Sequence, residues 1–358
     1  MPINPVVRPA VTRQQAPRGL FYCSVPDSGI AQIKPKNGQT PTAVFPNSIV
    51  LYPELFLELM RRSITYWHPA QDTFPLRGIP WIINTCADAD EYRSALEMLA
   101  KATAGTKMPV FNRPEVVLGT ARDKTPDLVS GIPNLIVPKC IKFEPKLPKD
   151  FQEAFERGGF DYPVLVRPAA SQTGRGLVKV DGPDDWDKIF AIDWAGRSLY
   201  MTQFVERRDK DGTFTKFRVA FINRKPYMKS ATTKDAYVVH GERRTIASAT
   251  KELAKLDLLA SDPKLAEVTK ALSERIRLNF WGVDLGWSAD GDFVFFEATA
   301  AMSIAARTHT PDDVWKIFSR IGQPIYDDLK TAMLAPASWN CWPDAEMAKP
   351  SNGQGRKG

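Results

Sequence analysis

The Asp290-Gly291 pair between two apolar runs is the feature that most limits what this chain can fold into. Asp-Gly flanked by alternating hydrophobic residues is a strong short-range signal for a β-hairpin, here joining GVDLGW to FVFFEAT. If these two residues are the centre of the turn, the numbers of cross-strand partners sum to 581. Asp284 then faces Glu297 directly, with Cβ atoms about 5 Å apart. A longer loop through Ala-Asp-Gly-Asp would shift this register.

Alternation along the two strands predicts one apolar face and one face that is small and polar. The apolar face contains Trp281, Val283, Leu285 and Trp287 opposite Val294, Phe296 and Ala298, and the polar face contains Gly282, Asp284, Gly286 and Ser288 opposite Phe295, Glu297 and Thr299. Like charges directly opposite each other destabilise a sheet, so a proton, a basic side chain or a divalent cation must offset them. Two carboxylates and a hydroxyl suit Mg²⁺ better than zinc. Pairing with Lys or Arg from a neighbouring strand is the alternative, and the pattern leaves it open.

Two further strand pairs lie upstream. VLVRP, which ends near Arg167, and LVKV flank a small polar loop whose backbone N–H groups and hydroxyls can wrap a polyphosphate; it consists of Ser171, Gln172, Thr173, Gly174, Arg175 and Gly176. The loop matches neither the Walker A motif nor the dinucleotide fingerprint, so by itself it is equally an ordinary hairpin loop. In KFRVAFI, Lys216 and Arg218 share one strand face, either as a solvated face or as the lining of a cleft.

The order of expected strands and helices divides the chain into an α/β part and an α+β part with antiparallel sheets. We expect a partly irregular N-terminal extension over 1–45, an α/β domain over 46–140, the hairpin-rich domain over 141–335 and a tail over 336–358. Within 46–140 the pattern predicts a helix over PELFLELMRRSITYW, a strand at PWIINT and a helix capped by Asp88. Within 141–335 it predicts one helix between the last two hairpins and another after Thr310-Pro311.

Bulk composition excludes several classes of protein. The 358 residues carry 48 basic and 41 acidic side chains, a net charge of +7 that suits an anionic ligand or an ordinary basic surface. The four cysteines have no CxxC spacing, which predicts reduced thiols in a cytoplasmic protein. No apolar run reaches membrane-spanning length. A nucleic-acid or partner-binding module has only the charge and the basic tails in its favour, and a homo-oligomer is an open alternative.

Taken in order, these motifs resemble the ATP-grasp superfamily, which includes glutathione synthetase and the D-alanine:D-alanine ligases. The resemblance lies in VLVRPAASQTGRGL, YMTQFVE, KFRVAFI and an Asp one hairpin before a Glu-x-Asn, here GVDLGW and DGDFVFFEAT, and it covers about 107–305. The nearest likeness is to a poorly characterised bacterial ATP-grasp group. The resemblance implies two α+β subdomains whose antiparallel sheets sandwich ATP, preceded by an α/β pre-ATP-grasp domain.

The same resemblance implies ATP and one or two Mg²⁺ ions as cofactors, with the Gly-containing loop closing over the phosphates. The implied nucleotide contacts are Lys124, Arg167, Ser171, Gln172, Thr173, Gly174, Arg175, Gly176, Gln203, Phe204, Val205 and Glu206, of which 203–205 line the adenine slot and Glu206 lies near the ribose. The implied metal ligands are Asp284, Glu297 and Thr299. Lys216 and Arg218 are the implied catalytic pair, steadying the transferring phosphoryl group.

The implied activity is that of an ATP-dependent carboxylate–amine ligase that works through an acyl phosphate on small-molecule or peptide substrates. Two departures from the family pattern keep alternatives open, because Arg167 stands where the family has lysine and Thr299 where it has asparagine. A phosphotransferase and a catalytically degenerate nucleotide-binding protein are those alternatives. Lys234 and His240 are further candidates to face the substrate, although a lone histidine is more often structural.

Overall fold

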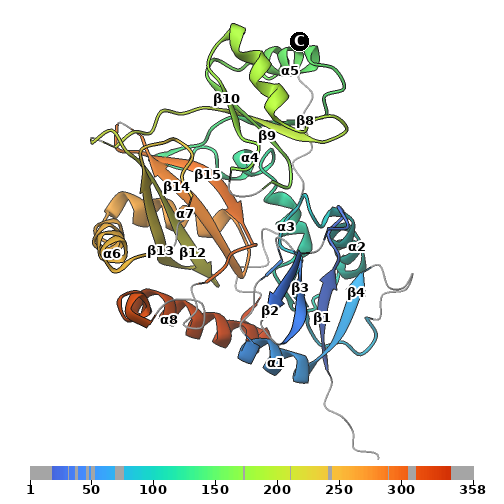
Figure 1. The fold of residues 1–358 in the computed structure, drawn as a ribbon. Helices are drawn as coiled ribbons and strands as arrows, with labels where there is room; N and C mark the ends of the chain where they lie inside the picture. Colours follow the sequence, from blue (N-terminus) through green and yellow to red (C-terminus); the bar gives the residue numbers. More distant parts are fainter. Residues whose placement is uncertain are drawn as a thin grey trace, which may run out of the picture.

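The computed structural model describes residues 18–30, 32–36, 39–45, 48–49, 53–68, 76–171, 174–209, 211–240, 244–288, 290–304 and 312–339. Several expectations concern residues outside these ranges: Gln172 and Thr173 of the loop, Cys341, the Thr310-Pro311 helix start, and residues 1–17 and 340–358 of the two predicted terminal segments. The described part is α+β, as expected, and contains three larger sheets, one two-stranded sheet and their helices (Figure 1).

The first sheet is parallel, with strand order β4-β1-β5-β6. Its strands are β1 (Gly19–Ser24), β4 (Ser63–His68), β5 (Ile82–Asn84) and β6 (Val110–Phe111). The helices of this part are α1 (Pro53–Arg62), α2 (Arg93–Thr103), α3 (Pro114–Gly119) and α4 (Thr125–Val129), and a separate hairpin pairs β2 (Gln32–Lys36) with β3 (Gln39–Val44). Every residue of β1 is buried, so a strand upstream of residue 46 forms the interior of this sheet.

Two predicted helix boundaries in this part are wrong. The helix expected over PELFLELMRRSITYW ends at Arg62, because its last residues form β4 alongside β1. Ile64, Thr65, Tyr66 and Trp67 are β-branched or aromatic, which favours a strand. Asp88 does not cap α2, which begins at 93. Its Oδ1 instead accepts hydrogen bonds from the backbone N–H groups of Asp90 and Glu91, at 2.8 and 3.0 Å.

The second sheet has the order β13-β12-β14-β15-β7 and is antiparallel except for β7. Its strands are β7 (Leu135–Ile136), β12 (Phe214–Ile222), β13 (Lys225–Lys234), β14 (Phe280–Trp287) and β15 (Phe293–Thr299). Its helices are α6 (Ile246–Ala260), α7 (Pro263–Arg275) and α8 (Asp312–Leu334), followed by the short η3 (Pro336–Ser338). Asp262 caps α7 as predicted. Helix α6 was not predicted; Thr245 and Ser248 cap it reciprocally, with serine where a capping box usually has Glu or Gln.

The third sheet is antiparallel, with the order β10-β9-β11-β8. It contains β8 (Cys140–Phe143), β9 (Val164–Pro168), β10 (Val178–Val180) and β11 (Leu199–Gln203), together with α5 (Lys149–Arg157) and η1 (Pro183–Ala191). Its buried residues, with Phe151 and Val166 at the centre, form a hydrophobic core of their own.

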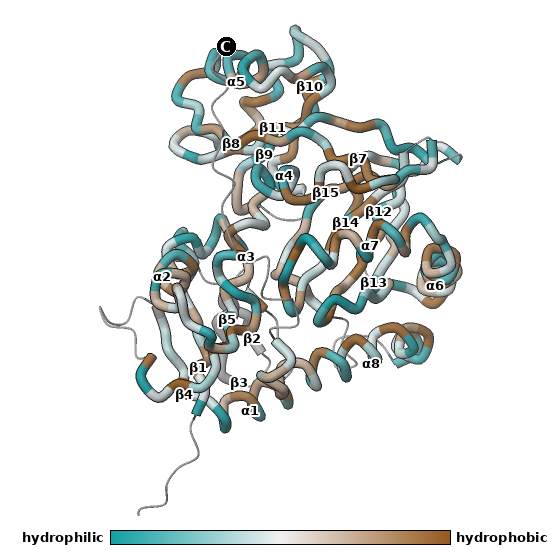
Figure 2. The backbone as a smooth tube through the Cα atoms, turned by 180° about the vertical axis from the view of Figure 1, so that it is seen from behind, coloured by the Kyte–Doolittle hydropathy of each residue, from teal (hydrophilic) through white to brown (hydrophobic). Residues whose placement is uncertain are grey.

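The first two sheets instead share a single core. Trp339 joins them: its ring meets Trp81 at 5.7 Å and Phe111 at 5.4 Å in the parallel-sheet part, both edge to face, and its carbonyl accepts a hydrogen bond at 2.7 Å from Asn279, directly before β14. Figure 2 shows the hydrophobic stretches along the strands and the more hydrophilic connecting loops. No helix in the described part of the chain is both long and apolar enough to cross a membrane. Cys23, Cys86 and Cys140, which lie in that part, form no disulfide.

Candidate functional site

Four charged or polar positions form one row across the five-stranded sheet. Asp284 on β14 faces Glu297 on β15, as predicted. On its other side Asp284 pairs with Arg218 of β12, and Arg218 pairs with Ser230 of β13. Backbone hydrogen bonding therefore fixes two acids and one base side by side, on the face opposite the apolar residues Phe217 and Val219.

The hairpin itself is built differently from the prediction. Near the turn, Ser288 N–H donates to the Asp292 carbonyl at 2.8 Å, so the loop contains more than two residues. The register changes by one between Asp284 and Leu285, which leaves Phe296 as the extra residue of a β-bulge. The longer loop and the bulge offset each other, and this is why Asp284 still faces Glu297.

The bulge also corrects the predicted faces of β15. Phe295 was expected beside the carboxylates, but it pairs with Leu285 of the apolar face, is 5% exposed and packs in the hydrophobic core, where it also borders the cavity. Val294 and Phe296 were expected in the core, but both line a cavity on the carboxylate side. A one-residue shift moves side chains to the opposite face of a strand, and the sequence did not reveal where that shift occurs.

A second bulge adjoins the row on its other edge. The β12–β13 register shifts between Arg218 and Val219, which leaves Lys229 without a cross-strand partner. Burial and the neighbouring charge of Arg218 lower the pKa of Lys229 to about 7.

Asp284 is held by two bases and is only 1% exposed. It accepts hydrogen bonds from Nε and Nη2 of Arg218, the latter at 2.6 Å, and its Oδ2 lies 3.0 Å from Lys216 Nζ. Burial raises the pKa of this carboxyl, but Arg218 and Lys216 outweigh burial and hold it well below its usual value. Pairing with basic neighbours, the alternative left open by the sequence, is therefore what these residues do here.

Glu297 is held by a base that the sequence did not indicate. Arg122, from the segment between α3 and α4, donates to Glu297 Oε2 and, at 3.3 Å, to the Phe296 carbonyl. Arg218 Nη2 lies 3.9 Å from the other oxygen of Glu297. Lys124, the cation expected from this segment, is exposed and does not line the cavity. In this segment the cavity is therefore lined by Arg122, two positions before the expected Lys124.

The predicted phosphate loop lies across the cavity from the row. Arg167 Nη2 donates to the Ser171 carbonyl and, at 3.0 Å, to the Ser171 hydroxyl, so this cation holds the base of the loop. Burial and the charge of Arg122 lower the pKa of Arg167 to about 10. Arg175 is exposed, and Gly176 packs near Pro168.

Gly174 places the tip of this loop against the segment that follows β13. Its φ is +70°, and a Cβ atom there would lie 2.8 Å from Val238 Cγ1 and 2.9 Å from His240 Cε1. Only glycine combines that backbone conformation with so close an approach. His240 therefore lines the cavity and contacts the loop, whereas nothing places Lys234 in the lining.

The residues predicted to contact the base lie together at the cavity. Gln203, Phe204 and Val205 all line the cavity. Lys179 Nζ lies 4.4 Å from the centre of the Phe204 ring, which packs edge to face on Tyr237. Glu206 does not line the cavity; it is exposed and lies 3.5 Å from Arg208.

Arg207 is a second cavity residue that the sequence did not indicate. It is 7% exposed, and its guanidinium lies 4.5 Å from the Phe296 ring and 5.5 Å from the Phe214 ring. It donates to the Tyr237 carbonyl at 2.5 Å, and burial lowers its pKa to about 10. An arginine beside the exposed Glu206 gives no sequence signal of such burial.

The cavity between the two antiparallel sheets measures about 170 Å³. Its lining includes Cys140, Leu165 and Thr202 of the four-stranded sheet and Asp284 and Glu297 of the five-stranded sheet. Four bases, Arg122, Arg167, Arg207 and Lys216, line it against two acids. An excess of basic side chains in a partly buried cavity favours a polyanionic ligand. Small-molecule pockets usually measure about 300–1,000 Å³, so a larger ligand requires the sheets to separate.

The carboxylate pair can be tested for its fit to Mg²⁺. Within the described ranges, no three His, Cys, Asp or Glu side chains cluster closely enough to hold a metal by themselves. Thr299, opposite Gly282, does not line the cavity, and its hydroxyl accepts the Ala301 N–H at 3.0 Å. Two carboxylates alone still fit Mg²⁺, because this ion commonly binds one or two carboxylates and completes its shell with phosphate oxygens and water.

Comparisons with known proteins give structural similarity but no sequence relative. No family model and no curated protein sequence matches the chain. D-alanyl-alanine synthetase A from Vibrio cholerae matches over 89% of this chain and 99% of its own, with 11% identity and a TM-score of 0.47. An ATP-grasp RimK domain protein from Sphaerobacter thermophilus matches over 85% and 99%, with 14% identity and a TM-score of 0.45.

A third solved structure, the VanG D-Ala:D-Ser ligase from Enterococcus faecalis, covers 72% of this chain and 73% of its own, with 15% identity and a TM-score of 0.43. Since all three TM-scores lie below 0.5, no residue role is transferred from these proteins.

Proposed function

We propose that this chain is an ATP-grasp ligase that binds Mg·ATP between its two antiparallel sheets and joins a carboxylate to an amine. The observation that carries the proposal is the row of Arg218, Asp284 and Glu297, with Lys216 and Arg122 beside it. Asp284, Glu297, Lys216 and Arg122 line a cavity with an excess of bases, and Gly174 of the loop lines it too. Arg218 does not line the cavity and holds Asp284 from the neighbouring strand.

In this reaction the protein positions groups and neutralises charge. A substrate carboxylate oxygen attacks the γ-phosphorus of ATP, the bond from that phosphorus to the β,γ-bridging oxygen breaks, and ADP leaves. The amine nitrogen then attacks the acyl carbon, phosphate leaves, and the nitrogen loses a proton. No nucleophilic side chain is needed for either step.

Each part of the site has a proposed task. Asp284 and Glu297 would hold Mg²⁺, which neutralises phosphate charge when bound. Lys216 and Arg218 would then turn from Asp284 toward the transferring phosphoryl group. Arg122 and Arg167 would contact the phosphate oxygens, and the segment 203–205 would contact the base.

Titration calorimetry tests the binding half of the proposal. ATP should bind the wild-type protein in Mg²⁺ and at least tenfold more weakly in EDTA. Glu297→Gln should weaken Mg·ATP binding at least tenfold, because one ligand charge is removed. Glu267→Gln, at an exposed site on α7, is the matched control and should leave affinity unchanged. Unchanged affinity in a folded Glu297→Gln variant would exclude the metal assignment.

Product analysis tests the catalytic half. ADP release is screened against amino acids and small carboxylates, with hydroxylamine present to trap an acyl phosphate as a hydroxamate. A carboxylate-dependent hydroxamate supports the ligase. ADP release accompanied by a phosphorylated alcohol would indicate a phosphotransferase, and tight binding without any turnover would indicate a degenerate nucleotide-binding protein.

A further inference from the structure

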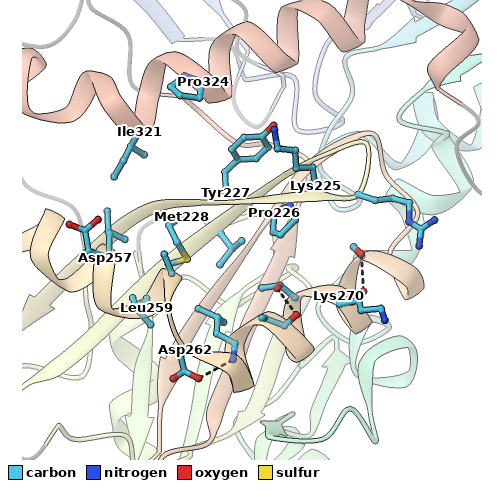
Figure 3. A pocket seen from close by; sticks show the side chains of 18 of the residues that line it. Lys225, Pro226, Tyr227, Met228, Asp257, Leu259, Asp262, Lys270, Ile321 and Pro324 are labelled. Atoms are coloured by element: carbon cyan, nitrogen blue, oxygen red, sulfur yellow. Dashed lines mark hydrogen bonds between the residues drawn. The ribbon is translucent and has the colours of Figure 1, made fainter.

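A second cavity lies on the opposite side of the five-stranded sheet from the carboxylate row and measures about 770 Å³. Figure 3 shows its walls, with Tyr227 and Met228 of β13 facing Ile321 and Pro324 of α8, and Leu259 of α6 on a further side. This volume lies in the range of about 300–1,000 Å³ that is usual for small-molecule sites.

The cavity is apolar along its length and basic at one end. Its apolar lining includes Val219, Met228, Leu256, Leu259, Leu265, Ile321 and Pro324. The hydroxyl of Thr269 donates within its own helix, at 3.1 Å to the Ala266 carbonyl, so it needs no ligand. A ligand that fits these walls therefore has an apolar body.

The basic end consists of Lys270 on α7 and Arg224 on the β12–β13 turn. Among the described residues, no carboxylate lies within ion-pair distance of the exposed Lys270. Arg224 reaches only Glu274, at 3.9 Å, one helical turn beyond Lys270 on the same helix. Arg320 is paired with Asp257 at 2.6 Å and Lys225 with Asp328 at 2.9 Å. Asp262, which also lines the cavity, accepts the backbone N–H groups of Lys264 and Leu265 as the cap of α7. An anionic group at the Lys270 end would complement the unpaired charge.

The floor of this cavity is the reverse side of the nucleotide site. Val219 and Met228 are cross-strand partners, and the register shift lies directly beside them. Val219 follows Arg218 in the chain, and Met228 precedes the bulged Lys229, so both apolar residues share their backbone with the charged row. A bulge interrupts regular pairing and lets one strand bend locally. Pressure on Met228 and Val219 would therefore change the position of Arg218 relative to Asp284.

We propose that this cavity binds an amphipathic anion, with its apolar body against Met228 and its charged group at Lys270, and that its occupancy changes nucleotide affinity across the sheet. The regulatory half rests on the proposed function of the carboxylate row. The binding half does not depend on it.

Dodecanoate, kept below its micelle concentration, is the probe for the binding half, measured by titration calorimetry on the full chain. It should bind saturably at one site per chain. Ala266→Trp fills the cavity from an exposed position in its wall and should weaken binding at least tenfold, whereas Glu267→Trp, exposed on the same helix outside the lining, should not. Lys270→Glu should weaken binding at least tenfold, and Lys251→Glu on α6 should leave it unchanged.

Dodecylammonium, with the same chain and the opposite charge, should bind at least tenfold more weakly than dodecanoate. Equal binding of the two, or full binding by Ala266→Trp, would overturn the site. Sedimentation velocity provides a third readout: a wild-type dimer that Ala266→Trp dissociates would mean that a second copy covers the cavity, and this too would overturn the proposal.

The regulatory half is tested by titrating Mg·ATP with and without saturating dodecanoate. The dissociation constant of ATP should change at least threefold in the wild type and remain constant in Ala266→Trp. ATP binding that dodecanoate does not alter would overturn this half. If ATP does not bind at all, the proposed function fails while the dodecanoate result still stands.

Discussion

The two sheets that enclose the proposed nucleotide cavity hold their polar groups in different ways. The five-stranded sheet fixes Arg218, Asp284 and Glu297 by cross-strand pairing, and it shares its core with the parallel sheet. The antiparallel four-stranded sheet contributes apolar Leu165 and one base, Arg167, to the cavity, and it has a separate core. Arg167 donates hydrogen bonds to Ser171 at the base of the loop. A sheet that shares its core with a neighbour can hold charges rigidly, whereas a separately packed sheet can move as a unit.

In the proposed reaction the two sheets would therefore have different tasks. The rigid side keeps the ionised row in place, and the separate side adjusts the width of a cavity that measures about 170 Å³ in this structure. The expected consequences are large stability effects on the rigid side and smaller effects, mainly on affinity, on the mobile side.

The first way to break this comparison is to remove the charge at the centre of the rigid row. Asp284→Asn leaves Arg218 and Lys216 without their buried partner, and losing one member of a buried pair costs about 3–5 kcal/mol. Urea denaturation measures the free energy of unfolding. Asp290→Asn, at an exposed loop position, should cost under about 0.5 kcal/mol. A loss for Asp284→Asn as small as that of the control would mean that the row is not rigidly paired.

Lys229, the extra residue of the bulge in β13, provides a pH-dependent test of the five-stranded sheet. The pKa of Lys229 is about 7 in the folded chain and 10.5 in its ordinary state. Between these values the unfolded state binds more protons, so this residue makes stability rise with pH. We expect a contribution of about 2 kcal/mol between pH 7 and pH 9.

Lys229→Met should remove that rise, and Lys251→Met, at an exposed position, should retain it. Denaturation curves of the three proteins at pH 7, 8 and 9 measure the difference. Parallel pH profiles for all of them would show that Lys229 keeps an ordinary pKa.

Arg122 lies outside the five-stranded sheet and contacts Glu297 of the row, so replacing it sharpens the comparison. Arg122→Gln should weaken Mg·ATP binding about tenfold, because this base contacts Glu297 in the cavity. Lys124→Gln should change it less than twofold, because that side chain is exposed and does not line the cavity. Calorimetry on both variants decides between them, and the reverse order of effects would restore Lys124 as the nucleotide contact.

The smallest expected effect concerns the loop on the mobile side. Gly174→Ala introduces a Cβ within 3 Å of Val238 and His240 and should weaken ATP binding about threefold by displacing the loop. Gly196→Ala is the matched control, since Gly196 has a φ of +71° but nothing within 4 Å of its Cβ position. Both should cost about 1 kcal/mol of stability, and only the first should alter affinity. Equal ATP affinities of the two variants would show that the loop does not take part in binding.

Much of the fold was accessible from local sequence signals. The strand pairs β9–β10, β12–β13 and β14–β15 followed from period-two alternation and turn residues. Helix α7 followed from its Asp-Pro start. Helix α6 was missed because its capping signal is weak, and β4 was assigned to a helix because its apolar residues continue the helical pattern of α1. The division of the chain at 46, 141 and 336 stays a prediction.

For the site, the sequence by itself determined that Lys216 and Arg218 share a strand face, because this relation depends on the short-range period of a strand. The predicted pairing of Asp284 with Glu297 is also present, but it holds because the longer loop and the bulge offset each other. Only the tertiary structure decided which bases hold the acids. Arg122 meets Glu297 across 175 positions of sequence, and Arg207 is buried between two rings that lie on different strands. It also decided where the two bulges interrupt pairing, and so which side of β15 faces the cavity. Such features arise from the packing of whole sheets, which no local pattern encodes.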